Sequence, residues 1–137
     1  MSVVSTLDSQ AKPASRQGPA RVLIVDDNRD AADSLAMLLA LDGHDVQVAY
    51  AGGEALDAVR DFQPSVVVLD LGLPDLNGFE VARRLRRDAD RDRLRLIALT
   101  GWGQAEDRRR TLEAGFDHHL TKPVDPEQLH RLLLQDG

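Results

Sequence analysis

Five polar side chains in this 137-residue sequence stand at the ends of short apolar segments, where a strand would meet its loop. They are Asp26, Asp27, Asp70, Thr100 and Lys122. Carboxylate oxygens with no histidine or cysteine among them suit Mg²⁺ or Mn²⁺. An aspartate beside such a cation, an ammonium and a hydroxyl can attack a phosphoryl group and become an aspartyl phosphate. Asp70 alone fits a loop-capping role equally well, so the rest of the chain must decide between these uses.

The balance of charge favours a cation at this site. Two carboxylates about 4 Å apart repel each other by roughly 4 kcal/mol at an effective dielectric constant near 20. Lys122 is the only lysine in the part of the chain that we expect to fold. Its ammonium against three carboxylates leaves a charge of −2, which one divalent cation would offset. A surface lysine that merely precedes Pro123 is the other interpretation, and the carboxylates weigh against it.

The hydrophobic pattern predicts the elements that must position these residues. Continuous apolar runs predict strands at 22–25, 46–49, 66–69, 94–99 and 116–121. Apolar residues at three- and four-residue spacing predict helices at 30–42, 55–62, 77–85, 104–114 and 125–133. Five strands that alternate with five helices on short connections predict an α/β fold, a doubly wound parallel sheet of the (βα)5 flavodoxin-like type.

The strand order decides whether the carboxylates meet. In an open parallel sheet, ligands bind beyond the carboxyl ends of the strands, where the strand order reverses. If the order is 2-1-3-4-5, that point lies between the first and third strands, and Asp26, Asp27 and Asp70 converge there. Thr100 and Lys122 would line the same edge of the sheet.

Composition limits the classes of protein. The chain has no cysteine, which excludes disulfides and thiolate metal sites. A net charge of −6 argues against general affinity for nucleic acid. No apolar run is long enough to span a membrane, and the N-terminus lacks the apolar core of a signal peptide. We therefore expect a cytoplasmic protein with a flexible tail at residues 1–20, a single folded domain at 21–135 and no attached output domain.

Four motifs carry a resemblance to a known family. They are Val22-Leu-Ile-Val-Asp-Asp27, Asp70-Leu-Gly-Leu-Pro-Asp-Leu-Asn-Gly78, Leu99-Thr-Gly101 and Lys122-Pro123. In this order and at this spacing, the set resembles the receiver domain of response regulators in two-component signalling, over about residues 21–135. The segment from Ala114 to Asp125 is also similar to receivers joined to hybrid histidine kinases.

The resemblance implies a role for each site residue. Asp70 would accept a phosphoryl group from the phosphohistidine of a histidine kinase or of a histidine phosphotransfer protein. Mg²⁺ (or Mn²⁺) would be held by Asp27, Asp70 and the backbone carbonyl of Gly72, with Asp26 acting partly through water. Lys122 would pair with Asp70 and then with the phosphoryl group, to which Thr100 would turn its hydroxyl. The Lys122–Pro123 bond would be cis.

Three positions leave alternatives open. His119 stands where the family usually has a tyrosine or phenylalanine that swings inward, so it either rotates as a switch residue or lies exposed in both states. Trp102 either shields the phosphoryl group, contacts a partner or packs in its loop. Gly72 leaves space beside the phosphoryl group, through which water can attack, and would shorten the lifetime of that group. A shielding Trp102 would lengthen it.

The competing functions belong to different classes. The first is a phosphoacceptor switch, not an enzyme with turnover, that acts on a protein target through the fourth helix, fifth strand and fifth helix, without binding nucleic acid directly. The second is a Mg²⁺-dependent phosphohydrolase with an aspartate nucleophile, which would need a second acid where Gly72 stands. The third is a nucleotide or flavin binder, but no glycine-rich phosphate loop follows the first strand.

Overall fold

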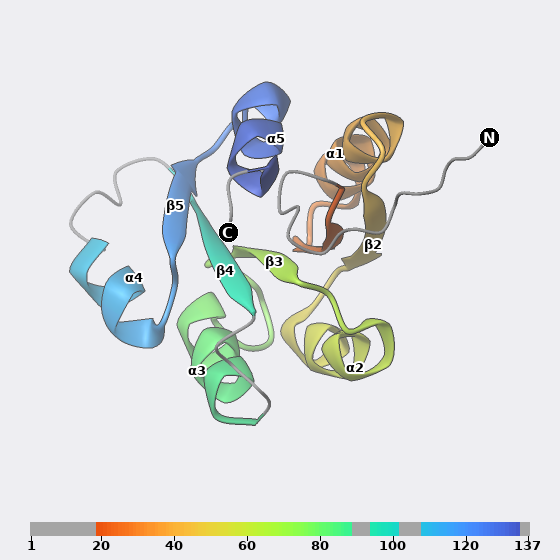
Figure 1. The fold of residues 1–137 in the computed structure, drawn as a ribbon. Coiled ribbons are helices and arrows are strands. Elements are labelled where there is room, and N and C mark those ends of the chain that lie inside the picture. The colour runs from red at the N-terminus through yellow and green to blue at the C-terminus, as the bar shows by residue number, and fades with distance from the viewer. Residues whose placement is uncertain (1–18, 89–93, 102–107, 135–137) are drawn as a thin grey trace.

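The computed structural model describes residues 19–88, 94–101 and 108–134, which form five strands and five helices in strict alternation (Figure 1). The strands are β1 (Arg21–Val25), β2 (Asp45–Ala49), β3 (Val66–Asp70), β4 (Arg95–Thr100) and β5 (His118–Thr121). The helices are α1 (Arg29–Leu41), α2 (Gly52–Phe62), α3 (Gly78–Asp88), α4 (Arg108–Ala114) and α5 (Pro126–Leu134). The predicted α/β alternation is confirmed. The first four residues of the predicted fourth helix, 104–107, lie outside the described residues.

The five strands form one parallel sheet in the order β2-β1-β3-β4-β5, as predicted. Every residue of β3 is buried, as a strand covered on both faces requires, whereas the edge strand β2 is partly exposed. The register places Val25 beside Leu69, and Asp70 beside Leu99. The carboxyl ends of β1, β3 and β4 therefore lie next to one another.

Helices cover both faces of the sheet (Figure 1). One face packs into a core with α2, α3 and α4, in which Leu69, Val81 and Phe116 are buried. The other face packs against α1 and α5, with Ile24, Leu39 and Leu129 fully buried. The residues of each strand point alternately to the two cores, so a single sheet separates two apolar layers.

The helix ends follow the local signals in the sequence. The Asn28 side chain accepts a hydrogen bond from the Ala31 backbone N–H and caps α1 (3.1 Å), and Asn77 does the same for Glu80 at the start of α3 (2.9 Å). Gly43 follows α1 with φ of +97°, a left-handed conformation that glycine adopts without strain. These caps fix where each helix leaves the loop that follows its strand.

A buried histidine joins the amino-terminal edge of the sheet to α5. The Ala20 backbone N–H donates to Nδ1 of His44 (2.9 Å), so the neutral ring must carry its hydrogen on Nε2. That nitrogen lies 2.9 Å from Nδ1 of His130 on α5. Burial lowers the pKa of His44, His130 lowers it further, and the carboxylate of Asp42 opposes them. This contact therefore requires a neutral His44.

Candidate functional site

Three carboxylates meet at the carboxyl edge of the sheet. Asp70 is the last residue of β3, and Asp26 and Asp27 follow β1, the neighbouring strand. One oxygen from each carboxylate lies within 4.8 Å of the others; Asp26 and Asp70 are buried and Asp27 is exposed. The group consists of oxygen ligands alone, with one member open to solvent, and this donor set fits a hard divalent cation such as Mg²⁺.

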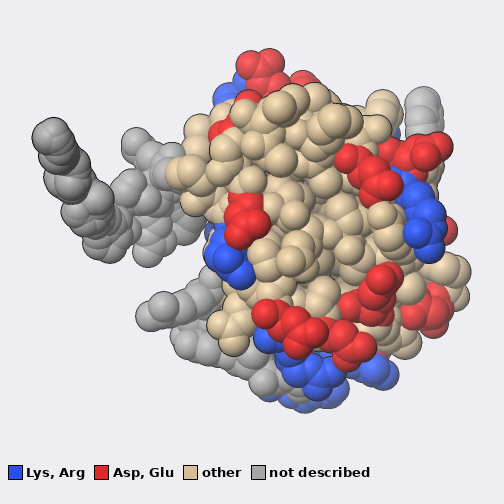
Figure 2. Space-filling model, turned by 90° about the vertical axis from the view of Figure 1, so that its right-hand side faces the viewer, with Lys and Arg blue, Asp and Glu red and all other residues tan. Residues whose placement is uncertain are grey.

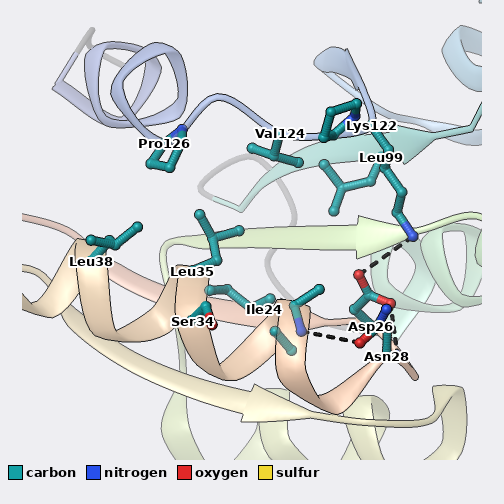
Figure 3. A pocket seen from close by; sticks show the side chains of 13 residues that line it. Ile24, Asp26, Asn28, Ser34, Leu35, Leu38, Leu99, Lys122, Val124 and Pro126 are labelled. Atoms are coloured by element: carbon teal, nitrogen blue, oxygen red, sulfur yellow. Dashed lines mark hydrogen bonds and ion pairs between the residues drawn. The ribbon is translucent and has the colours of Figure 1, made fainter.

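Lys122 provides the positive charge of the site. Its Nζ lies 2.8 Å from Oδ2 of Asp70 and 3.4 Å from Oδ2 of Asp26 (Figure 3 shows the second ion pair). Burial alone would lower the pKa of Lys122, but the hydrogen bond and charge of Asp70, together with Asp26, outweigh it and raise that pKa. Lys122 is therefore a firmly charged ammonium. The peptide bond between Lys122 and Pro123 is cis.

Asp26 is held in an electrostatically unfavourable place. Burial raises its pKa, and the nearby charge of Asp70 raises it further, while the Asn28 backbone N–H (3.0 Å from Oδ1) and the charge of Lys122 lower it. The balance is a raised pKa. A single ammonium does not fully compensate these carboxylates, which supports the sequence argument for a further positive charge.

The loop after β3 holds Asp70 in a fixed direction. The Gly72 backbone N–H donates to Oδ1 of Asp70 (2.9 Å), so both carboxylate oxygens of Asp70 have a donor. Further along, the Asp75 carboxylate accepts from the backbone N–H groups of Gly52 (2.8 Å) and Gly53 (3.0 Å) at the start of α2. These bonds lower the pKa of Asp75 to about 2, so the loop is anchored by a charged group at any ordinary pH.

Gly78 closes this loop by close packing. A Cβ atom at position 78 would lie 2.7 Å from Cα of Leu71 and 2.8 Å from the backbone oxygen of Asp70. The start of α3 therefore presses directly against the segment that carries the phosphoacceptor candidate. Only glycine permits an approach of this kind.

Thr100 and His119 contact each other on the neighbouring strands β4 and β5. Thr100 is 2% exposed, and its Oγ1 lies 3.1 Å from Nε2 of His119 and 3.5 Å from the backbone oxygen of Leu120. His119 is half-buried. The ring of His119 thus contacts Thr100 in this structure, and its rotation as a switch residue stays a prediction.

Some expectations are not decided by this geometry. Trp102 lies outside the described residues. The backbone oxygen of Gly72 remains a predicted metal ligand, and a Cβ added at Gly72 would lie 3.6 Å from Oδ1 of Asp70, an ordinary contact. The sequence reasoning overlooked Asp75 and Asn28 as supports of the site. The pattern of an asparagine before a helix was a signal for Asn28, whereas the contact of Asp75 with α2 is long-range and had none.

An apolar cavity of about 480 Å³ opens beside the carboxylates (Figure 3). It lies between α1 and the connection from β5 to α5, and Asp26 and Lys122 form its polar end. Leu35 and Leu38 of α1 face Val124 and Pro126 across it. The cavity therefore begins at the carboxylate site and extends along α1.

The outer surface of α1 continues this apolar character. Among the residues that the structure describes, four large hydrophobic side chains are exposed, and three are on α1: Met37 (61% exposed), Leu38 (42%) and Leu41 (77%). The face that contains β2, α1 and α2 has a broad uncharged area with charged side chains at its margins (Figure 2). Exposed apolar surfaces of this kind are commonly sites of contact with other macromolecules.

Comparisons with known proteins agree with this arrangement. Residues 22–134 match the family model of the response regulator receiver domain. The chain is 40% identical over 111 residues to the response regulator MprA of Mycobacterium sp. (strain KMS). This match covers 81% of the chain but 47% of MprA. It is also 40% identical over 114 residues to an uncharacterized 14.6 kDa protein of Leptolyngbya boryana, of which it covers 87%. The chain thus spans about half the length of MprA and most of the shorter relative.

Solved structures show the same fold. A CheY-like response regulator receiver domain protein from Methanospirillum hungatei superposes with a TM-score of 0.77 at 30% identity, over 85% of this chain and 91% of the other. The chemotaxis response regulator CheY4 of Vibrio cholerae gives a TM-score of 0.80 at 27% identity, over 88% and 100%. In the described residues, no helix has the length and apolar character needed to cross a membrane.

Proposed function

The chain belongs to the response regulator receiver domain family of two-component systems, and we propose that it is a phosphoacceptor switch in which Asp70 takes a phosphoryl group from the phosphohistidine of a histidine kinase or histidine phosphotransfer protein. The observation that carries this proposal is the place of Asp70. It is buried at the carboxyl end of a central strand, with Lys122 at 2.8 Å and two further carboxylates beside it.

In the transfer step, an oxygen of Asp70 attacks the phosphorus atom. A P–O bond forms, the P–N bond of the phosphohistidine breaks, and the released imidazole takes up a proton. Lys122 already contacts Asp70, so it can remain beside the group as the phosphoryl oxygens arrive and offset their negative charge. Thr100, at the end of the next strand, offers its hydroxyl to a phosphoryl oxygen.

Asp26, Asp27 and Asp70 are the side chains that would hold Mg²⁺, because they form the oxygen cluster described above. When bound, the cation supplies positive charge that neutralises the carboxylates and the transferring phosphoryl oxygens. The chain's own part is to fix the three carboxylates at adjacent strand ends, where the sheet register holds them.

The phosphodonor protein docks, in this proposal, on the apolar surface of α1. A donor histidine must reach Asp70 from outside, and the cavity beside Asp26 and Lys122 leads onto Leu38. Leu38 adjoins the exposed Met37 and Leu41 on the same helix. A partner helix with an apolar face fits such a surface.

Phosphorylation then changes the surface formed by α4, β5 and α5, to which the downstream target binds. A phosphoryl group adds about 1.5 to 2 negative charges, and a switch needs an element whose arrangement responds to that charge. Thr100 and His119 connect the site to β5. The target is a protein, because the net charge of −6 opposes direct contact with nucleic acid.

Intact mass spectrometry tests the proposal. The protein is incubated with Mg²⁺ and acetyl phosphate, and we expect the addition of one phosphoryl group per chain. Asp70→Asn should abolish it, while Asp57→Asn, an exposed acid on α2 outside the cluster, should not. Absence of the adduct, together with no spectroscopic response to beryllofluoride, would overturn the proposal. Rapid multi-turnover hydrolysis of phosphomonoesters would favour the phosphohydrolase instead.

A further inference from the structure

Two histidines at the amino-terminal edge of the sheet form a row of hydrogen bonds that ends on α5. The Ala20 backbone N–H donates to Nδ1 of His44 (2.9 Å), and Nε2 of His44 lies 2.9 Å from Nδ1 of His130. Because a backbone N–H can only donate, Nδ1 of His44 must be bare, and the ring hydrogen on Nε2 points to His130. The row therefore has one direction, from Ala20 through His44 to His130.

This row exists only while both rings are neutral. It needs a bare Nδ1 on His44 and one hydrogen between Nε2 of His44 and Nδ1 of His130, which leaves Nε2 of His130 to carry the second ring hydrogen of the pair. A third hydrogen must enter one of the two contacts. There it places two N–H donors opposite each other at 2.9 Å, either from Ala20 and His44 or from His44 and His130. Any proton that the pair binds therefore breaks one of its two hydrogen bonds.

The surroundings direct this proton to His130. Burial lowers the pKa of His44, which is 5% exposed. The side chain of His130 is 26% exposed, so a charge on this ring loses less hydration. Oδ2 of Asp42, at the end of α1, lies 3.6 Å from Nδ1 of His130. A small rotation of the ring brings a protonated Nδ1 within hydrogen-bond distance of this carboxylate.

Other charged groups around the pair have partners of their own. These partners are Arg21 for Asp45 (3.0 Å), Arg131 for Glu127 (4.0 Å) and the backbone oxygen of Leu132 for Arg95 (3.1 Å). Of these groups, Arg95 on β4 also contacts α5, through a bond that does not involve a histidine. Asp42 is therefore the acceptor to which a protonated His130 turns.

We propose that His44 and His130 form a pH-sensitive latch that ties α5 to the amino-terminal edge of the sheet. When His130 takes a proton from solvent, its bond with His44 opens and its Nδ1 donates to Asp42 instead. The latch lies at the opposite edge of the sheet from Asp70, so it goes beyond the proposed function and does not depend on phosphorylation. Because α5 belongs to the surface proposed for the downstream target, acid pH alters that surface through the latch.

Nitrogen-15 NMR of the histidine rings in the full chain tests the latch directly. Spectra are recorded between about pH 8 and about pH 5, the range in which a histidine changes its charge. At the upper end, we expect both rings to carry a hydrogen on Nε2, with a scalar coupling across the hydrogen bond from Nε2 of His44 to Nδ1 of His130. At the lower end, we expect this coupling to be lost and Nδ1 of His130 to carry a hydrogen.

The same spectra can overturn the proposal in two ways. A hydrogen on Nδ1 of His44 at about pH 8 would contradict the direction of the row. A coupling that persists at about pH 5, whether or not His130 has bound a proton, would show that the latch does not open.

Hydrogen exchange of the backbone amides of α5 measures what the latch does to this helix. The comparison is His44→Asn, whose side chain can still accept from the Ala20 N–H but is too short to reach His130. At about pH 8, the α5 amides of wild type should exchange about twofold to tenfold more slowly than those of His44→Asn, the equilibrium weight of one ordinary hydrogen bond. At about pH 5, both proteins should exchange at the same rate, because the latch is open in both. A difference of the same size at both pH values would refute the latch.

Two further variants complete the experiment. His118→Gln, at a half-buried histidine on β5, is the matched control and should follow wild type throughout. Asp42→Asn removes the acceptor of the protonated His130, so the latch should open at a pH about 0.2–0.7 unit lower, the effect of an ordinary exposed ion pair. An unchanged midpoint in Asp42→Asn would contradict the change of partner.

Discussion

Replacement of Gly78 with alanine tests the close packing behind Asp70. The new Cβ atom would lie 2.7 Å from Cα of Leu71, 2.8 Å from the backbone oxygen of Asp70 and 2.9 Å from Cδ2 of Leu71. Two of these three atoms belong to the backbone, so rotation of a side chain cannot relieve the overlap. Overpacking of this kind typically destabilises by about 1–3 kcal/mol, while alanine gains about 0.5–1 kcal/mol over glycine within a helix. We therefore expect Gly78→Ala to lower the free energy of unfolding by about 1–2 kcal/mol.

Gly53→Ala is the matched control, because Gly53 also lies in the first turn of a helix, α2. Its new Cβ atom would meet only Oδ2 of Asp75, at an ordinary 3.7 Å. This variant should gain up to about 0.5–1 kcal/mol from helix propensity. Urea unfolding followed by circular dichroism measures both.

A functional measurement accompanies the stability measurement. The backbone atoms that Gly78→Ala displaces belong to Asp70 and Leu71, so phosphorylation by acetyl phosphate should also slow, and in Gly53→Ala it should not. A Gly78→Ala protein as stable as wild type, and phosphorylated at the wild-type rate, would refute the packing argument.

Two further predictions follow from other parts of the molecule. His44 has a pKa lowered from 6.5 by burial, so below about pH 6.5 the unfolded chain binds the proton more readily and the free energy of unfolding falls as the pH falls. Urea unfolding at about pH 8 and about pH 5 should show this decline in wild type and in His118→Gln, but a smaller decline in His44→Asn. If the free energy of unfolding falls equally in all three proteins, His44 is not the cause of the decline. Leu41→Glu should slow phosphotransfer from the partner histidine kinase about tenfold or more, since it places a charge in the proposed docking surface, while phosphorylation by acetyl phosphate stays unchanged. Leu112→Glu, at an equally exposed leucine on α4, should leave transfer from the kinase intact, and a similar loss in both variants would refute docking on α1.

Much of the fold follows from local pattern. The run from Val66 to Leu69 predicted a strand buried on both faces, and β3 is buried throughout. Asp125 with Pro126 predicted the start of the last helix, where the Asp125 side chain accepts from the Glu127 backbone N–H (3.0 Å). These features depend on nearest neighbours along the chain, so a single sequence is enough to find them.

The strand order could not be predicted from the local sequence pattern. Periodicity indicates that strands alternate with helices, but it does not say which strands pair. The convergence of Asp26, Asp27 and Asp70 was conditional on the order 2-1-3-4-5, and the order came from the resemblance to a known arrangement. The observed strand order does bring the three carboxylates together.

The sequence by itself determined which chemical groups stand at the strand ends: three carboxylates, a hydroxyl and a single ammonium. Only the tertiary structure decided how these groups pair, because the contacts join residues from separate βα units. Lys122 lies against Asp70 across 52 positions of sequence, and Asp75 anchors its loop on a helix that precedes it by 22. The link between His119 and Thr100 likewise depends on the register of β4 with β5. The sequence specifies the type of each side chain, but the packing of the sheet sets the distances between them. The chemistry of Asp70 depends on both.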